Sequence, residues 1–248
     1  MDLLLDLGHS RLKWAGWAHG RLHAPGAAVW RGEPAAEFCE RVLADLAPPR
    51  RVAIAAVVRG PLLATLEAVV RARWDCAVYR PHSTARCGEV RSGYRDPAQL
   101  GFDRWAALIG AWARRPGCAA VVVDCGSAVT VDGLRDDGQH LGGVIFPGQE
   151  MMAEAFYART GLGRAVIGND ADVAADSTPD AVAAGARQAV LGGIERAMRA
   201  WDQRLPGAAL WLTGGAAPEL APDLPATLQS APHLVLEGLG QILQREEK

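Results

Sequence analysis

The sequence has no long run of lysine or arginine, and this absence limits the partners that can be expected. Its 248 residues carry 26 basic and 28 acidic side chains, which gives a formal net charge of −2. Nucleic acids and anionic membranes are usually bound through a concentrated basic surface. We therefore expect neither nucleic acid nor a membrane as a partner.

Long hydrophobic runs are also missing, most clearly at the N-terminus. The first apolar stretch consists of three leucines before Asp6, and no basic segment precedes it. A secretory signal needs a basic start and a longer apolar region, and a membrane span needs about 20 apolar residues. The sequence therefore predicts a cytoplasmic protein.

Metal-binding and disulfide motifs are absent as well. The five cysteines include no CxxC pair and have no histidine at zinc-ligand spacing, and the six histidines form no HExxH. We therefore expect reduced, mostly buried thiols and no zinc cluster. Cys125 has no neighbouring base in the sequence that would lower its pKa, so it is not predicted to be a nucleophile.

The motifs of two common nucleotide-binding folds are missing too. There is no GxxxxGK[ST], and no GxGxxG follows a predicted strand. Present instead are two similar segments, "LLLDLGHSRLKW" at 3–14 and "VVVDCGSAVTVD" at 121–132. In each, an apolar strand reaches an aspartate, turns at a glycine and resumes as a second strand.

The two segments align as an internal repeat. A shift of 118 residues (124 − 6) places Asp6 on Asp124 and Gly8 on Gly126. Glycine permits a positive φ and close approach of the backbone, so main-chain N–H groups can face a phosphate, while the aspartate can hold hydrated Mg²⁺ or another cation. Each segment taken singly is also consistent with a plain hairpin turn. The pairing, together with a later strand-turn-helix "LWLTGGAA" at 210–217, favours two turns that face each other around a nucleotide.

Strands and helices alternate along the chain, which is typical of an α/β fold. Strands are expected at 2–6, 11–18, 51–58, 119–124, 128–134, 140–146, 208–213 and 233–236. Helices are expected at about 34–46, 61–74, 103–115 and 178–204, after residue 148, after the glycines at 214–215 and at the C-terminus. The turn at Pro116 and Gly117 separates an expected N-terminal domain, 1–117, from a C-terminal domain, 118–248.

These features resemble the duplicated ribonuclease H-like fold that acetate and sugar kinases share with Hsp70 and actin, with two similar domains of mixed sheets flanked by helices. Within this superfamily the chain resembles type III pantothenate kinase. The segments that carry the resemblance are "GYRDPAQLGFDRWAAL" (93–108), "HLGGVIFPG" (140–148), "STPDAVAAG" (177–185) and "LVLEGLGQI" (234–242). The resemblance implies transfer of the γ-phosphoryl group of ATP to the primary hydroxyl of pantothenate, the first step of coenzyme A biosynthesis.

The resemblance also implies roles for particular residues. Phosphoryl transfer requires positioning, neutralised oxygens and a group that accepts the hydroxyl proton. Asp103 is the implied acceptor, and a role as helix N-cap is the alternative for the same side chain. Arg104 offers its guanidinium fork to the substrate carboxylate. The implied pantothenate contacts are Tyr94, Gly101, Phe102, Asp103, Arg104 and Thr178.

Residues of the repeated turns are implied in nucleotide and ion binding. Asp6 organises Mg²⁺ and ATP, and Asp124 binds a monovalent cation, K⁺ or NH₄⁺. Lys13 is alternatively a surface lysine, and Asp132 a solvated strand residue. The implied ATP contacts are Asp6, Leu7, Gly8, His9, Ser10, Arg11, Leu12, Lys13 and Ser127.

One position departs from the family pattern. The family usually has asparagine after the first glycine, where this chain has His9, which is bulkier and titrates near neutral pH. Because the other motif positions are intact, we expect the backbone N–H of His9 still to serve as a phosphate ligand.

The family's substrate pocket lies at a homodimer interface, so a homodimer is expected. Two other functions stay open, a non-catalytic regulatory accessory factor and, less readily at 248 residues, an ATP-gated chaperone or filament subunit.

Overall fold

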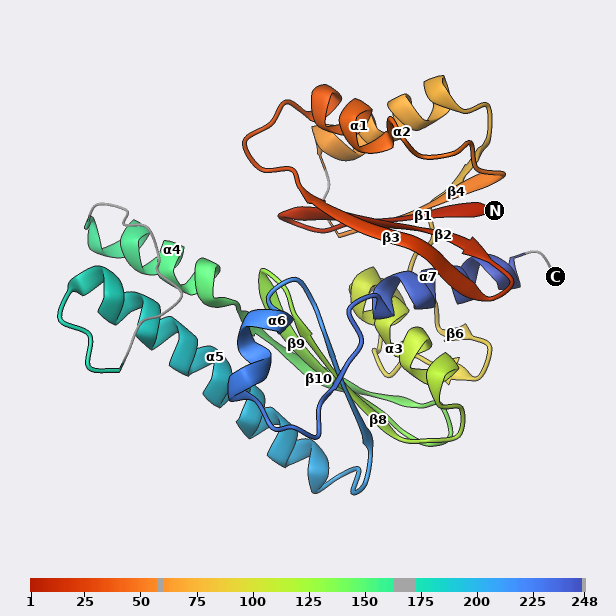
Figure 1. Ribbon diagram of the computed structural model, residues 1–248. Helices are drawn as coiled ribbons and strands as arrows, with labels where there is room; N and C mark the ends of the chain where they lie inside the picture. The colour runs from red at the N-terminus through yellow and green to blue at the C-terminus, as the bar shows by residue number, and fades with distance from the viewer. Residues whose placement is uncertain (58–59, 163–172, 247–248) are drawn as a thin grey trace. The chain divides into compact units, whose positions relative to one another are not determined.

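The computed structural model describes residues 1–57, 60–162 and 173–246 (Figure 1). Contacts group the chain into two compact units, described separately below. The first unit comprises Met1–Cys118, Asp136–Leu141 and His233–Lys248, and the second comprises Ala119–Arg135 and Gly142–Pro232. The C-terminal segment thus groups with the first unit, and the domain division at residue 117 stays a prediction.

The first unit is built on a mixed five-stranded sheet. Its strands are β1 (Asp2–Leu7), β2 (Arg11–Ala18), β3 (Arg21–Val29), β4 (Arg51–Ala56) and β5 (Ala77–Tyr79), in the order β3-β2-β1-β4-β5. β1 is antiparallel to β2 and parallel to β4, and β4 is parallel to β5. The central position of β1 explains why all six of its residues are buried.

The two faces of this sheet carry different helices (Figure 1). Helices α1 (Ala35–Leu43) and α2 (Pro61–Arg73) form a core with Leu3, Leu5 and Leu7 of β1. Since successive strand side chains point to opposite faces, Asp6 points away from this core. Helices α3 (Phe102–Arg114) and α7 (Leu234–Arg245) belong to that other side.

Helices α3 and α7 pack together very closely. A Cβ atom placed on Gly238 would lie 1.7 Å from the carbonyl oxygen of Ala106, so only glycine fits there. On the exposed side, the guanidinium of Arg114 donates two hydrogen bonds of 2.6 Å to the carboxylate of Glu237. These contacts hold α3 against α7 at Ala106 and at Arg114, the last residue of α3. Between α2 and α3 lie two short strands, β6 (Arg86–Cys87) and β7 (Val90–Arg91), and a 3₁₀ turn, Pro97–Gln99.

The second unit repeats the strand order of the first. Its sheet runs β10-β9-β8-β11-β12, where the strands are β8 (Ala120–Cys125), β9 (Ala128–Leu134), β10 (His140–Pro147), β11 (Ala209–Thr213) and β12 (Gln229–Ser230). β8 is antiparallel to β9 and parallel to β11, which is parallel to β12. The same topology in both units confirms the duplication read from the sequence.

The helices of the second unit are α4 (Gln149–Thr160), α5 (Thr178–Asp202) and α6 (Ala217–Leu220), followed by a 3₁₀ turn, Ala221–Asp223. α5 is the long helix beside the sheet in Figure 1, and its Val190 and Ile194 pack on Val121 and Val131. Ser177 caps its N-terminus by accepting the backbone N–H of Asp180 at 3.3 Å.

The strand predicted at 233–236 is wrong, because α7 begins at Leu234. Its first three residues, Leu234 to Leu236, are all apolar and buried, and a short apolar run of this kind does not distinguish a strand from a buried helix. The sequence reading also missed β3, an edge strand whose residues are mostly exposed or half-buried and which contains Pro25.

All five cysteines are free thiols, as expected. Cys39 and Cys125 are buried and the other three are half-buried, so fewer are buried than predicted. Within the described ranges, none of the helices has both the length and the apolar character that a membrane crossing requires.

Candidate functional site

The turn between β1 and β2 holds the first group of predicted residues. The strand register pairs Asp6 with Lys13, and the N–H of Gly8 donates to the carbonyl oxygen of Arg11 at 3.0 Å. His9 is exposed at the tip, whereas Leu7 and Leu12 are fully buried. The two leucine side chains therefore belong to the core, and only their backbone is placed to meet a ligand.

The glycines of the two repeated turns were expected to permit a positive φ and a close approach of the backbone. Gly8 and Gly126 are not among the residues with positive φ, so neither turn uses the left-handed conformation. A Cβ atom would lie 3.4 Å from the carbonyl oxygen of Arg11 at Gly8, and 3.3 Å from that of Ala128 at Gly126. Glycine serves here because the two strands approach closely, which leaves little room for a side chain.

Asp6 is a buried carboxylate at the end of the central strand. Burial raises its pKa to about 6, an effect that Lys13 opposes and Asp103 reinforces. The side chain is only 7% exposed. A carboxyl group whose charge is this unfavourable in the free protein gains from a cation brought by a ligand.

Asp103 lies at the start of α3 and interacts electrostatically with Asp6. The N-cap of α3 is Gly101, so the alternative role of Asp103 as N-cap is wrong. Its Oδ1 instead accepts the backbone N–H of Arg104 at 2.8 Å. A Cβ atom on Gly101 would lie 2.7 Å from that oxygen, so the glycine makes room for the carboxylate. The structure thus brings together the predicted Mg²⁺-organising and proton-accepting groups.

The predicted pantothenate contacts Tyr94 and Arg104 touch each other. Arg104 is buried, and its guanidinium donates to the hydroxyl oxygen of Tyr94 at 2.6 Å. Its central carbon also lies 5.5 Å from the centre of the Tyr94 ring. Tyr94 therefore holds a guanidinium that is otherwise expensive to bury.

His140 is a site neighbour for which the sequence reading assigned no role. Its ring is fully buried and stacks on Tyr94, with centroids 5.9 Å apart and an angle of 16° between the planes. Its Nδ1 accepts the backbone N–H of Gly93 at 3.4 Å. The histidine opens the segment "HLGGVIFPG", so the signal was the motif itself.

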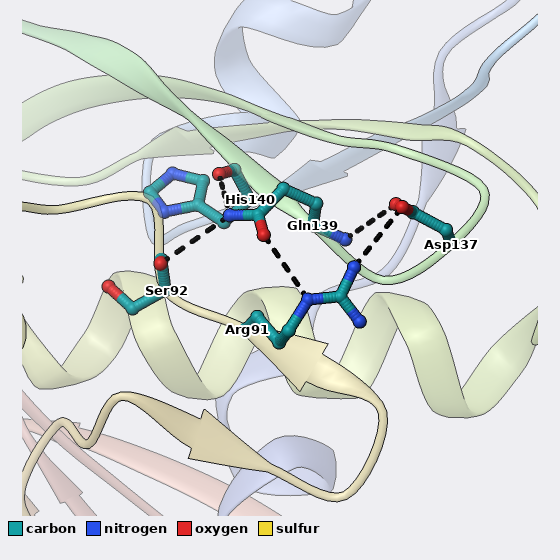
Figure 2. A network of polar contacts seen from close by, with 5 residues as sticks. All are labelled: Arg91, Ser92, Asp137, Gln139 and His140. Atoms are coloured by element: carbon teal, nitrogen blue, oxygen red, sulfur yellow. Dashed lines mark hydrogen bonds and ion pairs between the residues drawn. The ribbon is translucent and has the colours of Figure 1, made fainter.

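A polar network around Gln139 holds the backbone of His140 in place (Figure 2). Arg91 donates to Asp137 at 3.1 Å and to the side-chain oxygen of Gln139 at 3.2 Å. The amide nitrogen of Gln139 donates in turn to the carbonyl oxygens of His140 at 2.9 Å and of Ser92 at 3.4 Å. Residues 137–140 are thus tied to β7 and to the chain that leads to Tyr94.

The second turn, between β8 and β9, carries Asp124 and Ser127. The register pairs Asp124 with Thr130 on one side and with Thr213 on the other. A Cβ atom on Gly214, which has a φ of +102°, would lie 2.5 Å from Oδ1 of Asp124. The glycine turn after β11 therefore closes directly over the carboxylate.

The remaining predicted residues are spread over the two units. Thr178 is exposed at the first position of α5, Ser127 is half-buried in its turn, and Phe102 is buried. Burial raises the pKa of Cys125 to about 12, with Asp124 adding to the effect, which agrees with an inert thiol.

Two hollows of the first unit, of about 400 and 320 Å³, are lined by none of the predicted residues. The candidate site is therefore defined by side-chain chemistry and not by these hollows.

Two mixed sheets of the same strand order, each with an acidic turn after its central strand, define the class of duplicated ribonuclease H-like proteins. Solved structures agree. A Campylobacter jejuni protein described as a Baf family transcriptional activator matches with a TM-score of 0.59 and 20% identity, over 99% of this chain and 98% of that one. A Listeria monocytogenes protein described as an N-acetylmannosamine kinase matches with a TM-score of 0.52 and 11% identity, over 100% and 99%.

The chain belongs to the type III pantothenate kinase family. The profile of that family matches residues 2–200. A type III pantothenate kinase of Alkalilimnicola ehrlichii is 40% identical over 244 residues, which cover 97% of this chain and 96% of the relative. One of Halorhodospira halophila is 40% identical over 253 residues, which cover 96% of each.

Proposed function

We propose that this protein transfers the γ-phosphoryl group of ATP to pantothenate. The observation that carries the proposal is the juxtaposition of Asp103 with Asp6, beside the hydrogen-bonded pair of half-buried Tyr94 and buried Arg104. A carboxylate that accepts a proton, a second one suited to Mg²⁺ and a guanidinium suited to a carboxylate are the groups that this reaction needs.

In this proposal Asp103 accepts the proton of the pantothenate hydroxyl as that oxygen attacks phosphorus. Arg104, oriented by Tyr94, binds the carboxylate of pantothenate, and Gly101, Phe102 and Thr178 complete its contacts. Bound Mg²⁺ would neutralise phosphate charge, and Asp6 is the residue that would hold it. Its burial and raised pKa fit a carboxylate that ionises fully when a cation approaches.

ATP contacts are proposed from both repeated turns. In the first turn they are Asp6 to Lys13, with Leu7 and Leu12 contributing backbone only and Lys13 contributing its ammonium. In the second turn the contact is the hydroxyl of Ser127. Main-chain N–H groups at tight turns after strands are common phosphate ligands.

A coupled assay of ADP release tests this function. Purified protein with Mg-ATP and K⁺ is expected to release ADP with pantothenate and not with a panel of sugars and small acids. ADP release with a sugar in place of pantothenate, or no release with any acceptor, would contradict the proposal.

The turn position of His9 yields a prediction. Because His9 is exposed and the proposed phosphate ligand is its backbone N–H, His9→Asn is expected to tighten nucleotide binding about two- to fivefold by removing bulk beside the phosphates. Titration calorimetry with Mg-ADP measures this change. His19→Asn, in the exposed turn between β2 and β3, is the matched control. Weaker binding by His9→Asn would show that the imidazole itself contributes.

Asp124 is the proposed ligand of a monovalent cation, and its surroundings fit that role. Thr213, its register partner, is fully buried, and its hydroxyl has no hydrogen-bond partner among the described residues. Carboxylate and neutral oxygen ligands suit K⁺. Bound K⁺ would add a positive charge beside this turn.

Exchange of K⁺ for Na⁺ is therefore expected to lower activity severalfold and to lower the melting temperature of the protein. Asp124→Asn should abolish the difference between the two ions in both measurements. Equal activity and equal melting temperature of the unmodified protein in the two salts would contradict the assignment.

A homodimer is proposed from the exposed apolar side chains of β10 and α4. β10 is an edge strand whose Val144 and Ile145 are 47% and 59% exposed, and on α4 Met151 and Phe156 are 38% and 40% exposed. Exposed apolar edge strands are usually covered in native proteins. Ile145→Lys is expected to convert the dimer into a monomer, measured by light scattering. A dimer that survives this change would place the interface elsewhere.

A further inference from the structure

We propose that Trp30 is a positioning residue for nucleotide binding, through the turn at Gly8–Ser10. The inference rests on the proposed function, since it takes that turn as the phosphate-binding element. Trp30 lies immediately after β3, outside the repeated motif, and was not among the residues predicted from the sequence.

Trp30 holds the turn on both sides of His9. Its indole Nε1 donates a hydrogen bond of 3.0 Å to the carbonyl oxygen of Gly8. Its backbone N–H donates one of 3.2 Å to the carbonyl oxygen of Ser10. The second bond continues the β2–β3 ladder, where Arg11 pairs with Val29, and the first is an addition that only a side chain can make.

The indole contact determines which way the Gly8–His9 peptide faces. The described chain has no cis peptide bonds, so the carbonyl of Gly8 and the N–H of His9 point in opposite directions from one plane. With the carbonyl turned toward Trp30, the N–H of His9 is turned away from it. This is the backbone donor that the proposed function assigns to a phosphate oxygen.

The Trp30 ring is itself held in place. The ring packs against the core that α1 and α2 form with β1. The backbone carbonyl oxygen of Trp30 accepts the N–H of Glu33 at 3.4 Å. A rigid donor fixes the turn before the ligand arrives, which lowers the entropy that binding must overcome. Trp30 therefore affects binding of nucleotide more than the chemical step.

Steady-state kinetics of Trp30→Phe test this role, since phenylalanine keeps most of the apolar ring and loses only the donor. The KM for ATP is expected to rise about 3- to 10-fold, the effect of one hydrogen bond, while kcat and the KM for pantothenate stay within about twofold. Trp74→Phe is the matched control, because Trp74 is buried in the same core at the end of α2. An unchanged KM for ATP, or an equal rise in the control, would overturn the proposal.

A second measurement does not depend on catalysis. Indole N–H signals of ¹⁵N-labelled protein are recorded by NMR during titration with Mg-ADP, and the Trp30 and Trp74 signals are assigned by their loss in the two variants. The Trp30 signal is expected to shift and the Trp74 signal to stay. If Trp30→Phe does not fold, Trp30→Leu, which also lacks the donor, supplies the assignment and the KM. A stationary Trp30 signal in protein that binds Mg-ADP would overturn the inference, whereas failure to phosphorylate pantothenate would overturn only the proposed function.

Discussion

Asp103→Asn is expected to lower turnover by a factor of between about 10² and 10⁴, with a much smaller change in the affinity for ATP. Asparagine keeps the size of the side chain and can still accept the N–H of Arg104, which Oδ1 does now at 2.8 Å. What it loses is the ability to take a proton from the attacking hydroxyl. Single-turnover kinetics with saturating ATP and pantothenate measure the effect on the chemical step.

Asp96→Asn is the matched control for this prediction. Asp96 is an exposed carboxylate of the same segment, and its Oδ1 accepts the N–H of Ala98 at 3.0 Å at the start of the short 3₁₀ turn. Its replacement is expected to leave the rate within about twofold, since asparagine caps as well as aspartate. A full rate in Asp103→Asn would remove Asp103 from the mechanism.

Asp6→Asn is expected to stabilise the ligand-free protein while it weakens binding of Mg-ATP. Burial raises the pKa of Asp6 from 3.8 to about 6 in the folded state, so folding binds a proton between these values and stability falls as pH rises through them. Above about pH 7 the ionised carboxylate costs about 3 kcal/mol that asparagine avoids, and near pH 4 the gain disappears. Urea unfolding at pH 8, 6 and 4 measures the difference.

Asp2 provides a control of opposite sign on the same strand. Burial alone would raise the pKa of Asp2, but hydrogen bonds from Arg50 and Arg51 make the pKa lower than its ordinary value. Its ionised form therefore stabilises the fold above its unfolded pKa, and this contribution is lost as pH falls. Asp2→Asn is expected to destabilise the protein at pH 8. An Asp6→Asn variant that is less stable than the unmodified protein at pH 8 would contradict the origin given for its raised pKa.

The sequence predicted the repeated turns because their signal is local and occurs twice. An apolar strand, an aspartate and a glycine recur at a shift of 118 residues (124 − 6), and the two sheets have the same strand order. The helix that starts near Asp103 was also predicted closely, since an acid at its start and arginines at its end suit the two ends of a helix dipole. The start of α7 was misread because its first three residues are all apolar, and so short an apolar run does not distinguish a strand from a buried helix.

The sequence by itself determined the α/β class, the duplication and the chemical character of the acidic turns, since all three depend on residues that are near one another in the chain or on a pattern that repeats. Only the tertiary structure decided that Asp6 comes within electrostatic range of Asp103, that Tyr94 contacts both Arg104 and His140, and that Trp30 holds the first turn. These contacts join residues from separate strands and helices. Their distances, and the burial that raises the pKa of Asp6, arise only when the elements pack, which no local pattern encodes.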